Sequence, residues 1–259
     1  MPRNFSSFRY FLISLLVSLH CFAEAAASKD TSLLIDGWDN FKSPVTTDAK
    51  YFLLGGTALT ALFYLTRDQT QSWQEDMANN KPLGSSSNFG DLMGKQVPNL
   101  LYAGGMAAAE LFGDYKMGYR NASGMVSATV YSYLVTSALK YTIQEERPNH
   151  SSNHDSFPSA HTASAFAFAS YVGCRHSLSW GIAAYSLATF VGMSRINDNA
   201  HYIHDVVAGA TIGGSFGLGT CLAENKRSTE REHPKDEVKP SWYVVPQDGG
   251  FLGGFNVSY

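Results

Sequence analysis

The sequence predicts an all-α protein: a helical bundle of about six core helices, followed by a short C-terminal β-hairpin or tail. Beyond residue 50, six stretches of about helix length contain no Asp, Glu, Lys or Arg. They are rich in Ala, Gly, Ser and Thr, and they lack the alternating branched residues and regular turns of strands. The chain of 259 residues is long enough to enclose one sizeable core.

The uncharged stretches are the expected core helices, and their small residues let helix backbones approach closely. In chain order they cover residues 51–66, 96–109, 121–139, 156–174, 176–194 and 206–223. Between the first two, the polar segment 67–94 predicts a surface helix and a Gly/Ser connector.

The N-terminus has the features of a secretory signal. Arg3 and Arg9 precede an apolar run over residues 11–22, and Ala23-Glu24-Ala25 fits a small-residue cleavage site. We therefore expect residues 1–27 to be a signal peptide and the mature protein to be exported, periplasmic or envelope-associated. An uncleaved membrane anchor is the alternative.

The remaining chain divides into a helical domain at 28–223, a charged linker at 224–240 and a β-prone tail at 241–259. The linker has no core-forming residues and contains ten of the chain's charged residues. The tail has two β-prone runs around Asp-Gly-Gly, which predicts a hairpin, with a flexible tail as the alternative.

Charge and hydropathy limit the classes of partner. The net charge of -3 gives no reason to expect a nucleic-acid partner. Charged residues make up only 16% of the chain, which fits either tightly packed helices or contact with lipid. The mean hydropathy of -0.14 argues against a chain dominated by long aliphatic spans, so membrane association and integral insertion both stay open.

The first motif with chemical content is Lys140-Tyr-Thr-Ile-Gln-Glu-Glu-Arg147-Pro148. Seven residues are close to two helical turns, so Lys140 and Arg147 are expected on one helix face, with Pro148 ending the helix. Two cations placed in this way can hold one anion, Arg as a planar fork and Lys as a compact charge. Two solvated surface cations are the alternative.

The second motif is Phe157-Pro158-Ser159-Ala160-His161-Thr162, placed before a small-residue helix. Pro and Ser favour a helix start, where backbone N–H groups at Ser159, Ala160 and His161 can face an anion. His161 in that first turn can deliver a proton near neutral pH. A plain helix cap with a surface histidine is the alternative.

The third motif runs from Ser194-Arg195 to His201-Tyr-Ile-His-Asp205. If a helix begins near His201, His201 and Asp205 are one turn apart on one face. The carboxylate then holds one ring nitrogen and leaves the other free to attack. A structural hydrogen bond between His and Asp is the alternative.

Together the motifs K-x6-R-P, P-S-A-H and S-R-x5-H-x3-D resemble the signature of the type 2 phosphatidic acid phosphatase superfamily. This superfamily includes bacterial class A acid phosphatases and vanadium haloperoxidases. The resemblance implies that Lys140, Arg147 and Arg195 bind phosphate oxygens, with donors from Ser159 and Ala160. It further implies that His201 attacks phosphorus, Asp205 orients His201, and His161 protonates the leaving oxygen.

The implied function is a metal-independent hydrolase of phosphate monoesters or pyrophosphates, with a phosphohistidine intermediate and no cofactor. The substrate is a phosphate ester, and whether it is a lipid stays open. Two other functions also stay open: a vanadate-dependent haloperoxidase, since vanadate mimics phosphate, and a noncatalytic envelope protein that binds lipid.

Two details depart from this pattern. Ala160 stands where the family motif usually has Gly. If the site needs a positive φ at this position, Ala costs on the order of 1 kcal/mol more than Gly. His154, Asp155, His204 and Asp205 offer zinc-type ligands, but the neighbouring cations oppose a metal ion. We therefore expect no metal site, and we expect His204 to be a neighbour that points away from the working face of Asp205.

The cysteines left after removal of a signal peptide are Cys174 and Cys221. An even number of cysteines in an exported chain permits a disulfide. They follow His161 and Asp205 on helices that begin at the same site, at heights of roughly 20 and 24 Å. A bridge far from the site is compatible with these heights, and the sequence leaves its formation open.

Overall fold

The structure is a computed structural model, and it describes residues 31–113, 115, 117–232, 239–247 and 250–258. The expected signal peptide at 1–27 lies outside these residues and stays a prediction. The chain divides after Glu224 into two units, and the first contains the helical body.

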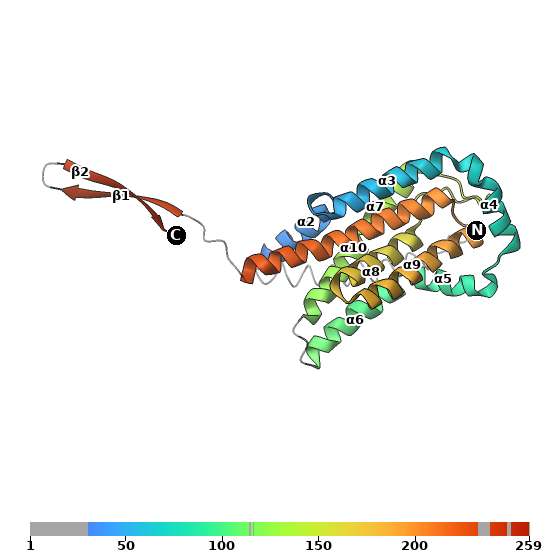
Figure 1. The fold of residues 1–259 in the computed structure, drawn as a ribbon, viewed down its shortest axis with the longest axis horizontal. Helices are drawn as coiled ribbons and strands as arrows, with labels where there is room; N and C mark the ends of the chain where they lie inside the picture. The colour runs from blue at the N-terminus through green and yellow to red at the C-terminus, as the bar shows by residue number, and fades with distance from the viewer. Residues whose placement is uncertain (1–30, 114, 116, 233–238, 248–249, 259) are drawn as a thin grey trace. The chain divides into compact units, whose positions relative to one another are not determined.

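All the regular secondary structure in the described part of the first unit is helical, which confirms the predicted all-α fold class (Figure 1). The elements are α2 (Thr31–Thr46), α3 (Ala49–Leu65), α4 (Arg67–Asn80), a 3-10 turn (Gly84–Ser86), α5 (Ser87–Gly94), α6 (Val97–Leu111), α7 (Gly118–Ile143), α8 (Ala160–Arg175), α9 (Leu178–Asn197) and α10 (Ile203–Glu232).

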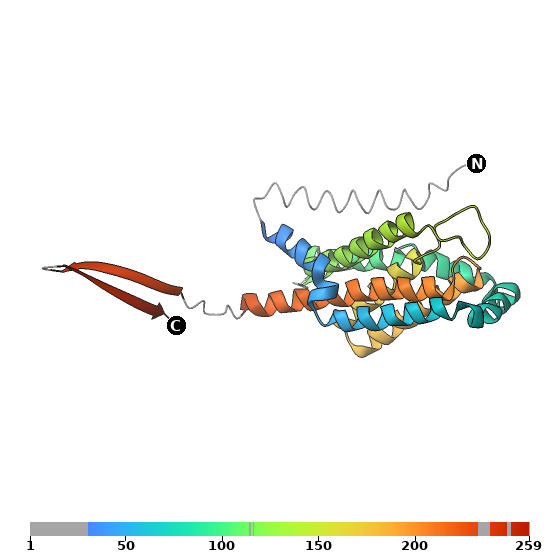
Figure 2. The same ribbon diagram turned by 90° about the horizontal axis from the view of Figure 1, so that it is seen from above.

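Each of the six uncharged stretches forms most of one long helix, so the predicted core helices are confirmed. Helix α8 packs against α7 and α9, and α6 packs against α7 (Figures 1 and 2). Small and medium apolar side chains fill this core, among them Met125, Ala169, Tyr171, Ala188 and Val191.

Glycine on α10 allows this helix to touch the backbone of α8 directly. A Cβ atom on Gly213 would lie 1.9 Å from the carbonyl oxygen of Ala163, and one on Gly209 would lie 2.4 Å from that of Ser159. Only glycine fits at such a distance. Because α8 carries Ser159 and α10 carries Asp205, this close approach sets the separation of two candidate site residues.

The segment before α6 is more structured than the sequence indicated. Helix α2 was not predicted, and the segment 67–94 contains two helices, α4 and α5, on either side of the 3-10 turn. In Figures 1 and 2, α4 and α5 lie at the end of the helical body where α10 begins. The expected connector therefore supplies part of the candidate site, since α5 contacts α8 and α9.

A disulfide joins Cys174 on α8 to Cys221 on α10, with the two Cα atoms 6.3 Å apart. The bridge that the sequence left open therefore exists in the structure. Cys174 lies in the last turn of α8, at the opposite end of this helix from Ser159, and Cys221 lies well inside α10.

The second unit covers residues 225–259 and is described by itself. Helix α10 continues to Glu232, so the charged segment begins as helix. Beyond the residues left undescribed, β1 (Lys239–Gln247) pairs antiparallel with β2 (Gly250–Ser258). The domain boundaries at 223 and 240 stay predictions.

Candidate active site

His201 and Asp205 meet where the loop after α9 enters α10. His201 precedes the helix, and Asp205 lies in its first turn. The Nδ1 atom of His201 is 3.5 Å from Oδ2 of Asp205, and both side chains are buried. The same Oδ2 accepts hydrogen bonds from the Ser156 hydroxyl at 2.6 Å and the Tyr202 N–H at 2.9 Å. Asp205 is thus oriented from three sides.

The surroundings of His201 favour the neutral imidazole. Burial lowers the pKa of His201 to about 4; the Asp205 carboxylate opposes this shift, and the charges of Lys140 and Arg147 add to it. At neutral pH the ring is therefore uncharged and keeps a lone pair. A lone pair at the ring nitrogen is what nucleophilic attack requires.

Lys140 and Arg147 converge by a route that differs from the expected one. Helix α7 ends at Ile143, with Gln144 in the left-handed region at φ 52°, so Arg147 lies in the following loop and Pro148 does not end the helix. The loop folds back, and Arg147 Nε donates to Asp155 Oδ1 at 2.8 Å. Lys140 Nζ donates to the carbonyl oxygens of Asp155 and Ser156. Both cations therefore meet at Asp155, although they do not share a helix face.

Ser159 caps α8, as its sequence position predicts. Its hydroxyl accepts from the Thr162 N–H at 3.4 Å and from the Thr162 hydroxyl at 3.0 Å. The N–H of Ser159 donates to the carbonyl oxygen of Asp205 at 3.0 Å, so this donor holds α8 to α10 and is not free for an anion. Ala160 begins the helix and is absent from the residues with positive φ, so the expected backbone cost does not arise.

His161 and Arg195 are joined by an acid from α5, Asp91. The distance from Asp91 Oδ1 is 3.1 Å to His161 Nε2 and 2.7 Å to Arg195 NH1. Lys95 pairs with the other carboxylate oxygen, and Asp198 holds NH2 of Arg195 at 3.0 Å. The proton donor and the third cation expected from the sequence thus share one carboxylate.

The pairing of Asp91 with His161, Arg195 and Lys95 shifts the pKa values of Asp91 and His161. The close approach of His161, together with Lys95 and Arg195, holds the pKa of Asp91 well below its usual range despite partial burial. Burial lowers the pKa of His161, and the Asp91 carboxylate opposes that shift. Asp91 therefore stays charged and favours the proton on His161.

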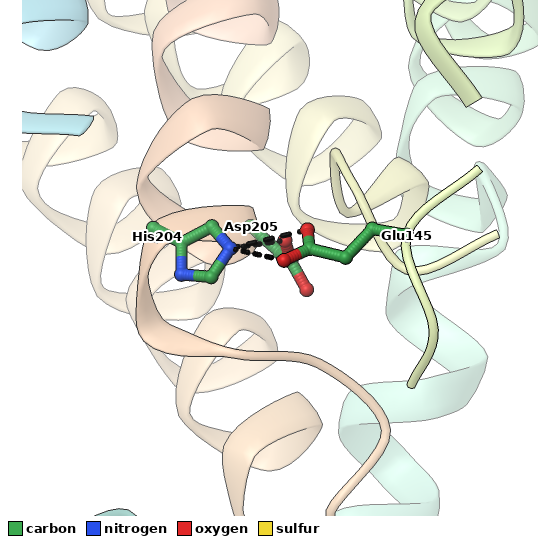
Figure 3. A group of neighbouring side chains, drawn as sticks. All are labelled: Glu145, His204 and Asp205. Atoms are coloured by element: carbon green, nitrogen blue, oxygen red, sulfur yellow. Dashed lines mark hydrogen bonds and ion pairs between the residues drawn. The ribbon is translucent and has the colours of Figure 1, made fainter. Parts of the chain in front are cut away.

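His204 lies against Oδ1 of Asp205, whereas His201 faces the other carboxylate oxygen, Oδ2. Its Nε2 is 3.3 Å from Asp205 Oδ1, and 3.0 and 3.1 Å from the two carboxylate oxygens of Glu145 (Figure 3). Ligand atoms of Glu145, His204 and Asp205 all lie within 4.8 Å of one another. These three are the described residues whose geometry suits a metal ion, although Lys140, whose charge acts on Asp205 and Glu145, opposes a cation.

The described geometry brings the expected residues together in two groups. One contains Lys140, Arg147, His201 and Asp205, and the other contains His161 and Arg195. Ser159 ties the start of α8, and with it the second group, to the backbone of Asp205. A nucleophile, a proton donor, three cations and a helix start are the parts that phosphoryl transfer uses.

Comparison with known proteins agrees with this arrangement. Residues 121–228 match the PAP2 superfamily, and the match contains all three motifs. This match confirms the resemblance to the superfamily that the motifs predicted from the sequence.

Individual relatives match parts of the chain. A lipid A 1-phosphatase of Porphyromonas gingivalis is 38% identical over 82 residues, covering 30% of this chain and 18% of that protein. A lipid A 1-phosphatase of Rhizobium etli is 30% identical over 112 residues, covering 38% of this chain and 48% of that protein. The matched segments therefore span less than half the length of these curated relatives.

Among solved structures, a transmembrane PAP2 type phosphatidylglycerolphosphate phosphatase from Bacillus subtilis aligns with 89% of this chain and 100% of its own. The sequence identity is 17% and the TM-score is 0.35.

Sequence reasoning missed four residues that hold the site: Asp91, Glu145, Asp155 and Ser156. Asp155 and Ser156 lie just before the second motif, so their position was a usable signal. Asp91 lies in a segment that resembled a surface connector, and its partners are about 70 and 104 residues away along the chain. A single sequence contains no local pattern for such a pairing.

Proposed function

We propose that this chain hydrolyses phosphate monoesters, with a lipid phosphate as substrate, through a phosphohistidine intermediate. The observation that carries the proposal is the buried, neutral His201 held by Asp205 beside the cations Lys140 and Arg147. A structural histidine would have no need of two cations and a second histidine at the same helix ends.

In the first step His201 Nε2 attacks phosphorus, a P–N bond forms and the P–O bond to the leaving group breaks. His161 gives its proton to the leaving oxygen. In the second step water attacks phosphorus and a new P–O bond forms, while His161 takes a proton from the water. The P–N bond breaks, its electron pair returns to His201 Nε2, and phosphate leaves. Asp205 stabilises the positive charge that forms on the His201 ring. No step is routed through a metal.

Three cations neutralise the oxygens of the transferring group, namely Lys140, Arg147 and Arg195. In the structure these cations contact acceptors of the protein itself: Asp155 and Asp91 hold the two guanidinium groups. Phosphate oxygens have to compete with these carboxylates or bind the remaining N–H groups. The N–H of Ala160 at the start of α8 is a further proposed donor, whereas that of Ser159 is already engaged.

A lipid substrate and an envelope location are supported by the exposed apolar surface. Relatives named lipid A 1-phosphatase act, by their names, on a lipid phosphate. Large apolar side chains are more than half exposed on α3, α6 and α9: Tyr51, Leu54, Leu62, Leu65, Leu101, Leu111, Phe112, Leu178, Trp180 and Ile182. So many exposed side chains favour contact with lipid.

By length and composition, one described helix could cross a membrane, Ile203–Arg231, and most of it is buried in the helical body. Burial makes it equally suited to be a core helix, so we propose membrane association and leave insertion to a test. Protein that stays in the membrane pellet after carbonate washing supports insertion, and protein released by the wash excludes it.

The function is tested by phosphate release from p-nitrophenyl phosphate and from a lipid phosphate in detergent micelles. His201→Ala is expected to lower kcat by at least about 10³-fold, because the nucleophile is lost. Unchanged phosphate release in this variant contradicts the proposal. Halide oxidation that appears only after vanadate is added, without phosphate release, favours a haloperoxidase instead.

A further inference from the structure

We propose that Glu145 and His204 form a positioning pair that fixes the carboxylate of Asp205 against His201. This inference rests on the proposed function, because it assigns a task to residues next to the proposed nucleophile. Glu145 and His204 stand at variable positions inside the first and third motifs, and neither touches His201 in the described contacts.

The two oxygens of Asp205 have different surroundings. Oδ2 faces His201 and accepts hydrogen bonds from the Ser156 hydroxyl and the Tyr202 N–H. Oδ1 is buried, makes no hydrogen bond of good geometry within the described residues, and faces His204 Nε2 at 3.3 Å. His204 therefore determines whether the Oδ1 side is held.

Aromatic rings fix the orientation of His204. The Tyr202 ring stacks on the His204 ring, with 5.3 Å between the ring centroids and 10° between the ring planes. Phe157 also stacks on it, at a centroid distance of 6.0 Å, and Tyr64 meets it edge-on at 5.2 Å. Its side chain is only 2% exposed. A ring packed in this way cannot swing aside without disturbing its neighbours, so Nε2 stays directed at Asp205 and Glu145 (Figure 3).

Glu145 completes a closed circuit of contacts. Its carboxylate holds His204, and its backbone oxygen accepts the N–H of Ser156 at 2.9 Å. The hydroxyl of Ser156 in turn donates to Asp205. The circuit Glu145–His204–Asp205–Ser156 thus ties the loop after α7 to the first turn of α10, with a hydrogen bond at Oδ2 of Asp205 and His204 Nε2 facing Oδ1.

The pair also influences charge near the nucleophile. The single nitrogen Nε2 of His204 carries at most one proton and faces carboxylate oxygens of two acids. The charged groups that act on His201 are Asp205, Lys140, Arg147 and Asp155. Since Glu145 adds a second negative charge behind Asp205, neutralising it should lower the pKa of His201 further.

Three variants of the full-length protein test the pair. His204→Leu removes the N–H and is expected to lower kcat on the order of tenfold, with KM changed less than about twofold. His204→Gln keeps an N–H near the Nε2 position and is expected to recover most of kcat. Glu145→Gln keeps the shape, removes the charge and is expected to move the acidic limb of the kcat/KM profile to lower pH.

His150→Leu is the matched control, because His150 lies in the same loop with its side chain 85% exposed. It should leave kcat and the pH profile unchanged. Thermal unfolding of every variant separates lost stability from lost positioning, and Glu145→Gln and His204→Gln keep the test valid if the Leu variant does not fold.

Folded His204 and Glu145 variants with the wild-type kcat and pH profile would overturn the inference, while the His201→Ala result decides the proposed function independently. A second overturning result is stoichiometric Zn²⁺ binding to the purified protein that disappears in Glu145→Gln and His204→Leu. That outcome would make the group a metal site.

Discussion

Helices α8 and α10 begin together at the candidate active site and reach the Cys174–Cys221 disulfide further along, so two ends of one helix pair can be compared. At the disulfide end, Arg175 pairs with Glu224, and the Tyr171 hydroxyl donates to the same acid at 2.8 Å. A covalent bond lies in the same region. At the site end there is no such bond between the two helices, and Ser159 joins them by a backbone hydrogen bond.

The difference lies in how carboxylates are used. Glu224 pairs with Arg175 and accepts from the Tyr171 hydroxyl, whereas Asp91 pairs with His161, Arg195 and Lys95, and Asp205 lies between His201 and His204. A carboxylate shared by two groups can lose one partner and stay paired with the other. Such a site can exchange a contact for a substrate, while the far end holds its shape.

The largest expected effect is on stability at the far end. Glu224→Gln leaves the buried Arg175 without its carboxylate, which should lower the free energy of unfolding by about 3–5 kcal/mol. Chemical denaturation measures this change. Glu230→Gln is the control, since its pair with Lys226 is exposed and should contribute less than about 1 kcal/mol. Equal effects in both variants would contradict the structural role of Glu224.

The disulfide gives the next effect. Replacing both Cys174 and Cys221 by Ser opens a link across 47 residues and should lower the free energy of unfolding by about 2–4 kcal/mol. Phosphatase activity per folded molecule should stay at the wild-type value, because the bridge lies far from His201. A specific loss of kcat in folded protein would show that the two ends are coupled.

The fold was predictable because its main signals are local. Six uncharged, small-residue stretches each define one helix, and the spacing of Cys174 and Cys221 from the motifs allowed for the bridge. Helices α2 and α5 were missed, because α2 contains Pro44 and α5 is only eight residues long. Their helical state depends on packing more than on sequence pattern.

The site was predictable only in part. The three motifs point to the proposed nucleophile, proton donor and cations, since each motif has a spacing that can be recognised. The groups that hold them do not follow from the motif spacing. Asp91 comes from α5, Glu145 and His204 stand at variable positions of the motifs, and their contacts form only when the chain folds. The same folding commits the Ser159 N–H to Asp205, which no local pattern indicates.

A third test addresses shared carboxylates at the site end. Asp91→Asn keeps an acceptor for Arg195 but removes the charge that favours the proton on His161. We expect kcat to fall about 10²-fold on an alkyl phosphate. The fall should be smaller on p-nitrophenyl phosphate, whose leaving group needs less protonation.

Asp198→Asn is the matched control for this test, because Asp198 holds Arg195 at 3.0 Å and makes no described contact with His161. It should weaken binding without a dependence on the leaving group. If both variants respond alike to the leaving group, Asp91 does not act through His161.

The smallest expected effect is a pH dependence of substrate binding. Burial lowers the pKa of Lys140 to about 8, against the opposing charges of Asp155, Asp205 and Glu145, and with the charge of Arg147 adding to the shift. Below that pH the Lys140 ammonium is charged and attracts phosphate. As the pH rises through about 8, the Lys140 side chain becomes neutral. KM for p-nitrophenyl phosphate should then rise about tenfold, which corresponds to the binding free energy of one charge-assisted hydrogen bond. In Lys140→Arg the side chain stays charged at every pH used, so the rise of KM above about pH 8 should disappear. If the rise of KM persists in that variant, another group titrates, and Lys140 holds the carbonyls of Asp155 and Ser156 without binding substrate.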